Sequence, residues 1–191
     1  MARVREFDQM QVTEKALELF WEKGYYNTSI QELVDAIGIG RGSLYNTYGS
    51  KHDLFLLTLD TYTDKRNRQV LDQLRRLPVK EAFGDFMAGA VEDMINDPNS
   101  KGCFIVNTMT EMASIDQEVH KRLSRSEDLL ISCFEDALQY GVDHGEISAD
   151  KNLRELAVFL STTLKGLRVR SKVVKEREAL MSAVNIAMTV L

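Results

Sequence analysis

The sequence predicts an all-α protein of about nine helices, with a small N-terminal three-helix domain followed by a larger helical bundle. Its 191 residues include only two prolines and many strong helix formers. Apolar residues recur at helical spacing along nearly the whole chain. A tight turn that contains glycine also joins two short helical segments near residue 40.

Composition and charge place the chain among soluble globular proteins. Apolar residues make up 44% of the sequence and charged residues 28%, with a formal net charge of −5. The first residues lack the apolar core of a secretory signal, and no stretch approaches the roughly 20 apolar residues that span a bilayer. Cys103 and Cys133 make neither a disulfide framework nor a zinc pattern. We therefore expect a cytoplasmic protein with no membrane association.

The N-terminal region divides into three short helices. The first runs from about residue 8 to residue 23, carries one apolar stripe and ends at Gly24. Ser29 and Glu32 form a capping-box pattern at the start of the second, which extends to residue 37. After the turn at residues 38–40, residues 41–47 form the third helix.

The remaining helices follow from glycine, proline and apolar periodicity. Ser50 caps a fourth helix that runs to about residue 76, before Pro78. Further helices are expected over residues 80–95, 102–113, 116–144, 150–170 and 173–190. We therefore assign residues 1–50 to an N-terminal domain, residues 51–76 to a linking helix, and residues 77–191 to a second domain.

The second and third helices form a helix-turn-helix pattern, in which the second helix of the pair enters a DNA major groove. Residues 1–51 hold six Lys/Arg and seven Asp/Glu, so a positive footprint for DNA must be local. Arg41 and Lys51 would supply it, together with Arg3 and Arg5. Alternatively, the region is a small helical domain with a polar surface. Poor helix formers in the third helix, such as Gly42, argue against that alternative.

Residues 12–59 closely resemble the DNA-binding domain of the TetR family of bacterial transcriptional regulators. The resemblance rests on Leu19-Phe20-Trp21-Glu22-Lys23-Gly24-Tyr25, Thr28-Ser29-Ile30, Ala36-Ile37-Gly38-Ile39, Arg41-Gly42-Ser43-Leu44-Tyr45-Asn46-Thr47-Tyr48 and Ser50-Lys51. It implies phosphate contacts from Thr28, Tyr45 and Lys51, and base or nearby backbone contacts from Arg41, Gly42, Ser43, Asn46 and Thr47. Two positions depart from the family pattern: Gly40 replaces a common Ser or Thr helix cap, and Thr47 replaces a common His.

A single recognition helix reads few base pairs, so we expect a homodimer that binds a palindromic operator in double-stranded DNA. The last two helices carry apolar stripes suited to a self-complementary interface, although both stripes could instead pack inside the monomer. The resemblance favours dimerisation through these helices. The expected interface residues are Leu156, Phe159, Thr163, Val184 and Met188.

The middle helices are expected to surround a pocket for a small hydrophobic effector. Aromatic and Met side chains at helical spacing also suit a plain core, so polar residues within apolar helices are the better indicators. The candidate pocket residues are Phe86, Met87, Met94, Cys103, Asn107, Thr108, Glu111 and Phe134.

Cys103 follows Lys101-Gly102 at the expected start of the sixth helix, where the helix N-terminus and a lysine would both activate a thiol. The segment Lys101-Gly102-Cys103-Phe104-Ile105-Val106-Asn107 resembles a motif in a subgroup of TetR-like regulators, some of which sense electrophiles or oxidants through this cysteine. The alternative is a small buried apolar residue.

Enzymatic chemistry is not indicated. The three histidines are isolated, and Asp116, Glu118 and His120 would not share one helix face as a metal site requires. No cofactor is expected. The sequence thus predicts a dimeric repressor that a small molecule or thiol modification releases from its operator. The alternatives are a DNA-binding protein without a small-molecule response, or a helical binding module.

Overall fold

A computed structural model describes residues 9–76, 78–97 and 99–191, and this part of the chain folds into nine α-helices without strands. The all-α prediction is confirmed. The helices are α1 (Gln9–Lys23), α2 (Ile30–Ile37), α3 (Arg41–Tyr48), α4 (Lys51–Leu74), α5 (Val79–Ile95), α6 (Phe104–Met112), α7 (Gln117–Asp143), α8 (Leu153–Arg170) and α9 (Arg177–Met188). Arg3, Arg5 and the expected start of the first helix at residue 8 lie outside the described residues.

The short helices begin and end where local chemistry dictates. Ser29 caps α2 in a complete capping box with Glu32, whose pKa the Lys23 ammonium and the Ser29 backbone amide lower to about 2. Gly38 ends α2 with φ of 80°, a left-handed conformation that glycine adopts without strain. Ser50 accepts a hydrogen bond from the Asp53 amide at the start of α4. These caps fix the turns on both sides of α3.

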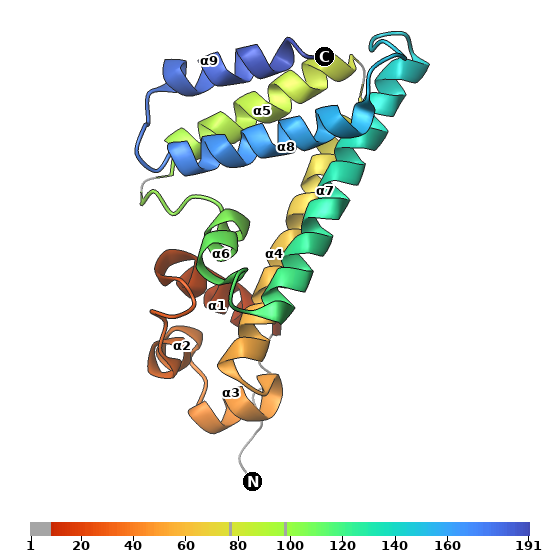
Figure 1. The fold of residues 1–191 in the computed structure, drawn as a ribbon. Helices are drawn as coiled ribbons and strands as arrows, with labels where there is room; N and C mark the ends of the chain where they lie inside the picture. The colour runs from red at the N-terminus through yellow and green to blue at the C-terminus, as the bar shows by residue number, and fades with distance from the viewer. Residues whose placement is uncertain (1–8, 77, 98) are drawn as a thin grey trace.

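Two long helices, α4 and α7, lie side by side and connect the two ends of the molecule (Figure 1). The bundle formed by α5, α8 and α9 packs at one end of this pair, and α1–α3 lie at the other. α6 lies beside α1, and its residues Phe104 and Met112 belong to the same apolar cluster as those of α1–α3. A second cluster fills the bundle around Phe83, Phe134 and Leu160.

Candidate nucleic-acid interface and ligand cavity

The outward side of α3 offers a polar surface held in place by one buried residue. Leu44 is fully buried, and Tyr48 is half-buried against the same cluster. The recognition-helix surface comprises the exposed residues Arg41, Gly42, Ser43, Tyr45, Asn46 and Thr47. A helix with this division can present polar groups to a DNA groove without disturbing its own packing.

The first turn of α3 differs from those of α2 and α4 in its capping. Gly40 occupies the N-cap position, and no side chain accepts a hydrogen bond from the first-turn amides. The departure from a Ser or Thr cap therefore has a visible structural consequence. Unlike the capped ends of α2 and α4, this helix start leaves its amides to solvent or to a phosphate oxygen.

Two expected phosphate contacts lie in unlike surroundings. Lys51 is half-buried at the start of α4, with its ammonium 4.3 Å from the centre of the Tyr25 ring, and burial lowers its pKa. Thr28 is only 1% exposed, and its hydroxyl donates to the Gly24 carbonyl at 2.7 Å. The Thr28 hydroxyl therefore serves the loop between α1 and α2 in this structure, and its phosphate contact stays a prediction.

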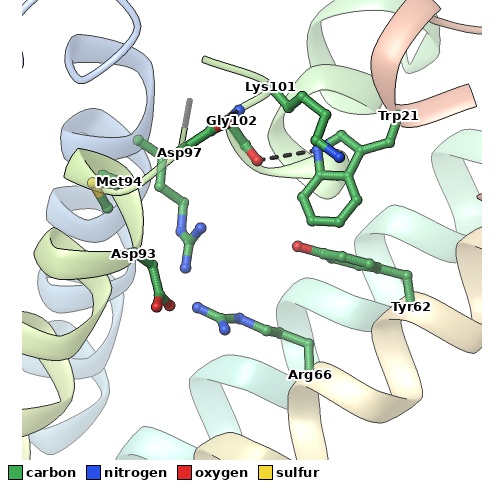
Figure 2. Close-up of a pocket in the computed structure, with 9 residues that line it drawn as sticks. Trp21, Tyr62, Arg66, Asp93, Met94, Asp97, Lys101 and Gly102 are labelled. Carbon is green, nitrogen blue, oxygen red and sulfur yellow. Dashed lines mark hydrogen bonds between the residues drawn. The ribbon is translucent and has the colours of Figure 1, made fainter. Parts of the chain in front are cut away.

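A cavity of about 210 Å³ lies where the α1–α3 end meets the bundle, and we call it the seam cavity. Its lining comes from α1, α4, α5, α8 and the loop before α6: Trp21, Tyr62, Arg66, Asp93, Met94, Asp97, Lys101, Gly102 and Arg168. Figure 2 shows Tyr62 and Trp21 on one side and Asp93 and Met94 on the other. The indole N–H of Trp21 donates to the Gly102 carbonyl at 3.0 Å, which ties α1 to this loop.

Two arginines dominate the electrostatics of the seam cavity. Arg168 is 8% exposed, and its Nη2 atom is fully buried without a hydrogen-bond partner in the described part of the chain. Burial, reinforced by the nearby charge of Arg168, lowers the pKa of Arg66. Burial likewise raises the pKa of Tyr62, whose hydroxyl therefore stays protonated. The cavity wall is thus rich in hydrogen-bond donors.

Cys103 lies directly beside this cavity. Its thiol is 5% exposed, and its Sγ lies 3.9 Å from the Tyr62 hydroxyl. It also lines a smaller space of about 40 Å³, together with Phe86, Arg66 and Arg168. Cys103 is the N-cap residue of α6, so the expected place at the helix start is confirmed, but the thiol is covered.

Side-chain contacts join α6 and the loops around it to the α1–α4 end. The carboxylate of Glu111 accepts from the backbone amides of Tyr25 and Tyr26, at 3.1 and 3.0 Å. His52 of α4 lies 2.7 Å from Asp116, the residue that caps α7. These contacts connect α6 to the loop that precedes α2, and the residue before α7 to the start of α4.

Three of the eight expected pocket residues line a cavity, and the other five do not. Met94 lines the seam cavity, and Phe86 and Cys103 line the smaller space beside it. The other five are placed elsewhere: Met87 and Phe134 are packed in the bundle cluster, Thr108 is buried in α6, Asn107 donates to the Lys101 carbonyl, and Glu111 binds the Tyr25 and Tyr26 amides. Neither cavity described above is lined by these five.

Of the nine residues that line the seam cavity, only Met94 was expected in a pocket; the unpredicted residues include Trp21, Tyr62, Arg66 and Arg168. A signal for two of them exists in the sequence. Arg168 follows Leu160 and Leu164 at four-residue spacing, so it continues the buried face of its helix. Arg66 likewise precedes the buried Val70 by four residues. A charged residue on an apolar face needs a partner, and that need could have identified the site.

The expected dimer residues are not all at the surface. Phe159 is 43% exposed, and Leu156, Thr163 and Met188 are half-buried. Val184 is 1% exposed because it packs into the bundle cluster, so it is unsuited to contact a second protomer. Exposed apolar side chains on the two helices are Val158, Phe159, Val169 and Ile186.

Within residues 9–76, 78–97 and 99–191, His, Cys, Asp and Glu form no group of three that could hold a metal ion. No helix in the described ranges combines the length and apolar character needed to cross a membrane.

Comparison with known proteins decides the family. Residues 12–58 match the family model described as bacterial regulatory proteins of the tetR family, and residues 81–187 match the tetracyclin repressor-like C-terminal domain. The chain belongs to the TetR family of bacterial transcriptional regulators. The resemblance of residues 12–59 is thereby confirmed, and the chain is a DNA-binding regulator and not an enzyme.

Relatives of known sequence and structure extend this result over the whole chain. The uncharacterized HTH-type transcriptional regulator YezE of Bacillus subtilis is 34% identical, with all of both chains covered. The HTH-type transcriptional repressor ComR of Escherichia coli is 27% identical over 94% of this chain and 86% of its own. A cysteine mutant of the TetR family regulator CifR, complexed with 26-base-pair operator DNA, is 30% identical, with a TM-score of 0.86 and 98% of each chain covered.

Proposed function

We propose that this TetR-family regulator is a homodimeric repressor that binds a palindromic operator and leaves it when a small molecule binds or a thiol is modified. The observation that carries the proposal is the recognition-helix surface: six exposed residues on one short helix anchored by a buried Leu44. Relatives support it, since ComR is named as a repressor and CifR has been seen on operator DNA.

Exposed apolar groups on the last two helices support dimerisation. Phe159 and Ile186 are 43% and 67% exposed, and Val158 and Val169 lie exposed on the same helix as Phe159. Pairing of such surfaces would remove apolar area from water. A dimer would place two recognition helices on one face of DNA, where adjacent major grooves lie roughly 34–36 Å apart.

Release from DNA is proposed to act through α4. This helix begins beside α3 and contributes Tyr62 and Arg66 to the seam cavity, so one rigid element reaches both sites. An occupant that favours a different tilt of α4 would change the spacing between recognition helices in the dimer. The thiol of Cys103, 3.9 Å from Tyr62, offers a second route to the same helix, as in the subgroup that the Gly102-Cys103 motif resembles.

DNA recognition is tested with single-residue variants of the protein, whose binding is measured to an operator selected from random duplexes. Arg41→Ala and Asn46→Ala should each weaken binding by about 1–3 kcal/mol and relax base preference at one position. Lys51→Ala should weaken binding to all sequences and reduce the salt dependence by about one counterion. Lys80→Ala, exposed on α5, is the charge-matched control. Equal binding by all four variants would refute the assignment.

Dimerisation and thiol sensing have separate tests. Phe159→Asp should yield a monomer in light scattering, whereas Ile115→Asp, exposed between α6 and α7, should not.

For the thiol route, an electrophile should release wild type and the Cys133→Ser variant from the operator but not Cys103→Ser. If Cys103→Ser responds like wild type, the thiol route is wrong and small-molecule release alone remains.

A further inference from the structure

The seam cavity contains positive charge that the described part of the protein does not neutralise. We propose that it binds a small monocarboxylate, held by Arg66 and Arg168, with an apolar body against Trp21 and Met94. The inference rests on the proposed function, because it names the chemical class of effector for a regulator that responds to small molecules.

Arg168 provides the strongest observation. Its side chain is more than nine-tenths buried, yet its Nη2 has no acceptor within the described residues. A guanidinium cannot lose its proton to escape this situation, and a buried charge without a partner is destabilising. Arg66 lines the same cavity, and neither arginine takes part in an ion pair in the described ranges. An anion in the cavity would satisfy both.

The other charged groups of the lining indicate a single negative charge on the ligand. Lys101 is paired with Glu18, and the Asp97 carboxylate accepts from the Gly102 amide at 2.7 Å and is balanced by the nearby positive charge of Lys175. Asp93 is the remaining carboxylate, and Figure 2 shows the Arg66 guanidinium pointing toward it without an ion pair. Two arginines against one aspartate leave one positive charge, which a monocarboxylate neutralises.

The volume and the apolar lining of the cavity limit the size and the apolar part of the ligand. A dry cavity of about 150 Å³ can hold benzene, so about 210 Å³ accommodates one ring, or a short alkyl chain, together with a carboxylate. The Trp21 ring and the Met94 thioether offer apolar surface, and the protonated Tyr62 hydroxyl can donate to the ligand. Planar guanidinium groups match carboxylate geometry better than any other side chain.

The position of this cavity would couple ligand and DNA. Trp21 belongs to α1, Arg66 to α4 and Arg168 to α8, so a bound carboxylate would touch the DNA-binding end, the connecting helix and the bundle together. Trp21 also donates to Gly102, immediately before Cys103 and α6. A ligand against its ring therefore acts on the contact that joins α1 to that loop.

The sequence contains one tryptophan, Trp21, so fluorescence excited selectively at tryptophan reports on a residue of this cavity. The probes are benzoate and hexanoate, with benzamide and hexanamide as neutral controls of the same shape. At least one acid should change the fluorescence and bind at least tenfold more tightly than its amide. Arg66→Met and Arg168→Met should each weaken that acid at least tenfold, whereas Asp93→Asn should tighten it by removing the competing carboxylate.

Thermal unfolding distinguishes a binding role from a structural one. Arg168→Met should leave the melting temperature of the free protein unchanged or higher, since it removes a buried charge, while it abolishes the increase caused by the acid. If Arg168→Met instead unfolds the protein, the binding role is judged from Arg66→Met, which should weaken acid binding, and from Asp93→Asn, which should tighten it.

Two results would overturn the inference: amides that bind as tightly as acids, or fluorescence that no acid changes. Measurements of operator binding then distinguish a failure of the carboxylate site from a failure of the proposed ligand-responsive regulation. Release of DNA by neutral compounds, with Arg66→Met unaffected, would refute the carboxylate site and keep ligand-responsive regulation. Operator binding that responds to no compound and to no thiol reagent would refute the regulation itself.

Discussion

The recognition-helix surface and the seam cavity are built in opposite ways. The first uses six exposed residues of one short helix, α3, which lie around a buried Leu44. The second brings together residues as far apart in sequence as Trp21 and Arg168, and it buries a guanidinium whose Nη2 has no hydrogen-bond partner among the described residues. A surface of the first kind is complete within one protomer, whereas a cavity of the second kind gains stability when an occupant arrives.

The DNA-binding end and the bundle would not be separate if they shared one packed core, and α6 is the element that could join them. Phe104 of α6 is buried in the α1–α3 cluster, against the rings of Phe55 and Tyr62. Phe104→Ala should cost about 3–5 kcal/mol of stability, as should Phe134→Ala in the bundle cluster. Only Phe104→Ala should speed hydrogen exchange in α1–α3. Equal exchange there in both variants would mean that the molecule has one cooperative core.

The loop between α1 and α2 gives a sharper test of the link between the regions. Gly24 has φ of 81°, and an added Cβ would lie 2.9 Å from the Glu111 carboxylate, whereas Gly38 has φ of 80° with open space around it. Both Ala variants should lose about 1–2 kcal/mol to backbone strain. Gly24→Ala should lose more, because it displaces the carboxylate that binds the Tyr25 and Tyr26 amides. Denaturant unfolding measures both, and equal losses would show that the Glu111 contact is unimportant.

The smallest expected effect concerns pH. Backbone amides, above all that of Val119, and the side chain of His52 lower the pKa of Asp116. Because the pKa is lower in the folded protein, the contribution of Asp116 is present above its unfolded value of about 4 and is lost as pH falls further. Asp116→Asn should therefore flatten the acid side of the stability curve slightly. An unchanged curve would show that this cap does not join α4 to α7 energetically.

The fold and the DNA-reading element could be predicted because their determinants are local. The Ser29–Glu32 capping box, the Gly38 turn and the Ser50 cap each lie within a few residues of the helix end that they define. The bounds of the nine described helices differ from expectation by only a few residues. The burial of Thr28 could not be predicted in this way, because it depends on neighbours that a motif does not specify.

The cavity was largely missed because its residues meet only in three dimensions. Met94 and Cys103 were expected near a ligand, but the aromatic and Met stripes around Met87 and Phe134 proved to be core. Glu111, a polar residue in a largely apolar helix, found its partners in backbone amides of another segment. The Nη2 of Arg168 has no hydrogen-bond partner in the described part of the chain, and that difference is visible only once the helices are packed.

Coupling between the seam cavity and the recognition helix can be tested by a single linked titration. Operator affinity is measured with and without a saturating amount of the carboxylate that binds Trp21 most tightly, and carboxylate affinity is measured with and without operator. We expect carboxylate and operator each to weaken the binding of the other by the same factor, of at least tenfold, in wild type and not in Arg66→Met. Operator affinity that stays unchanged while the carboxylate occupies the cavity would contradict it.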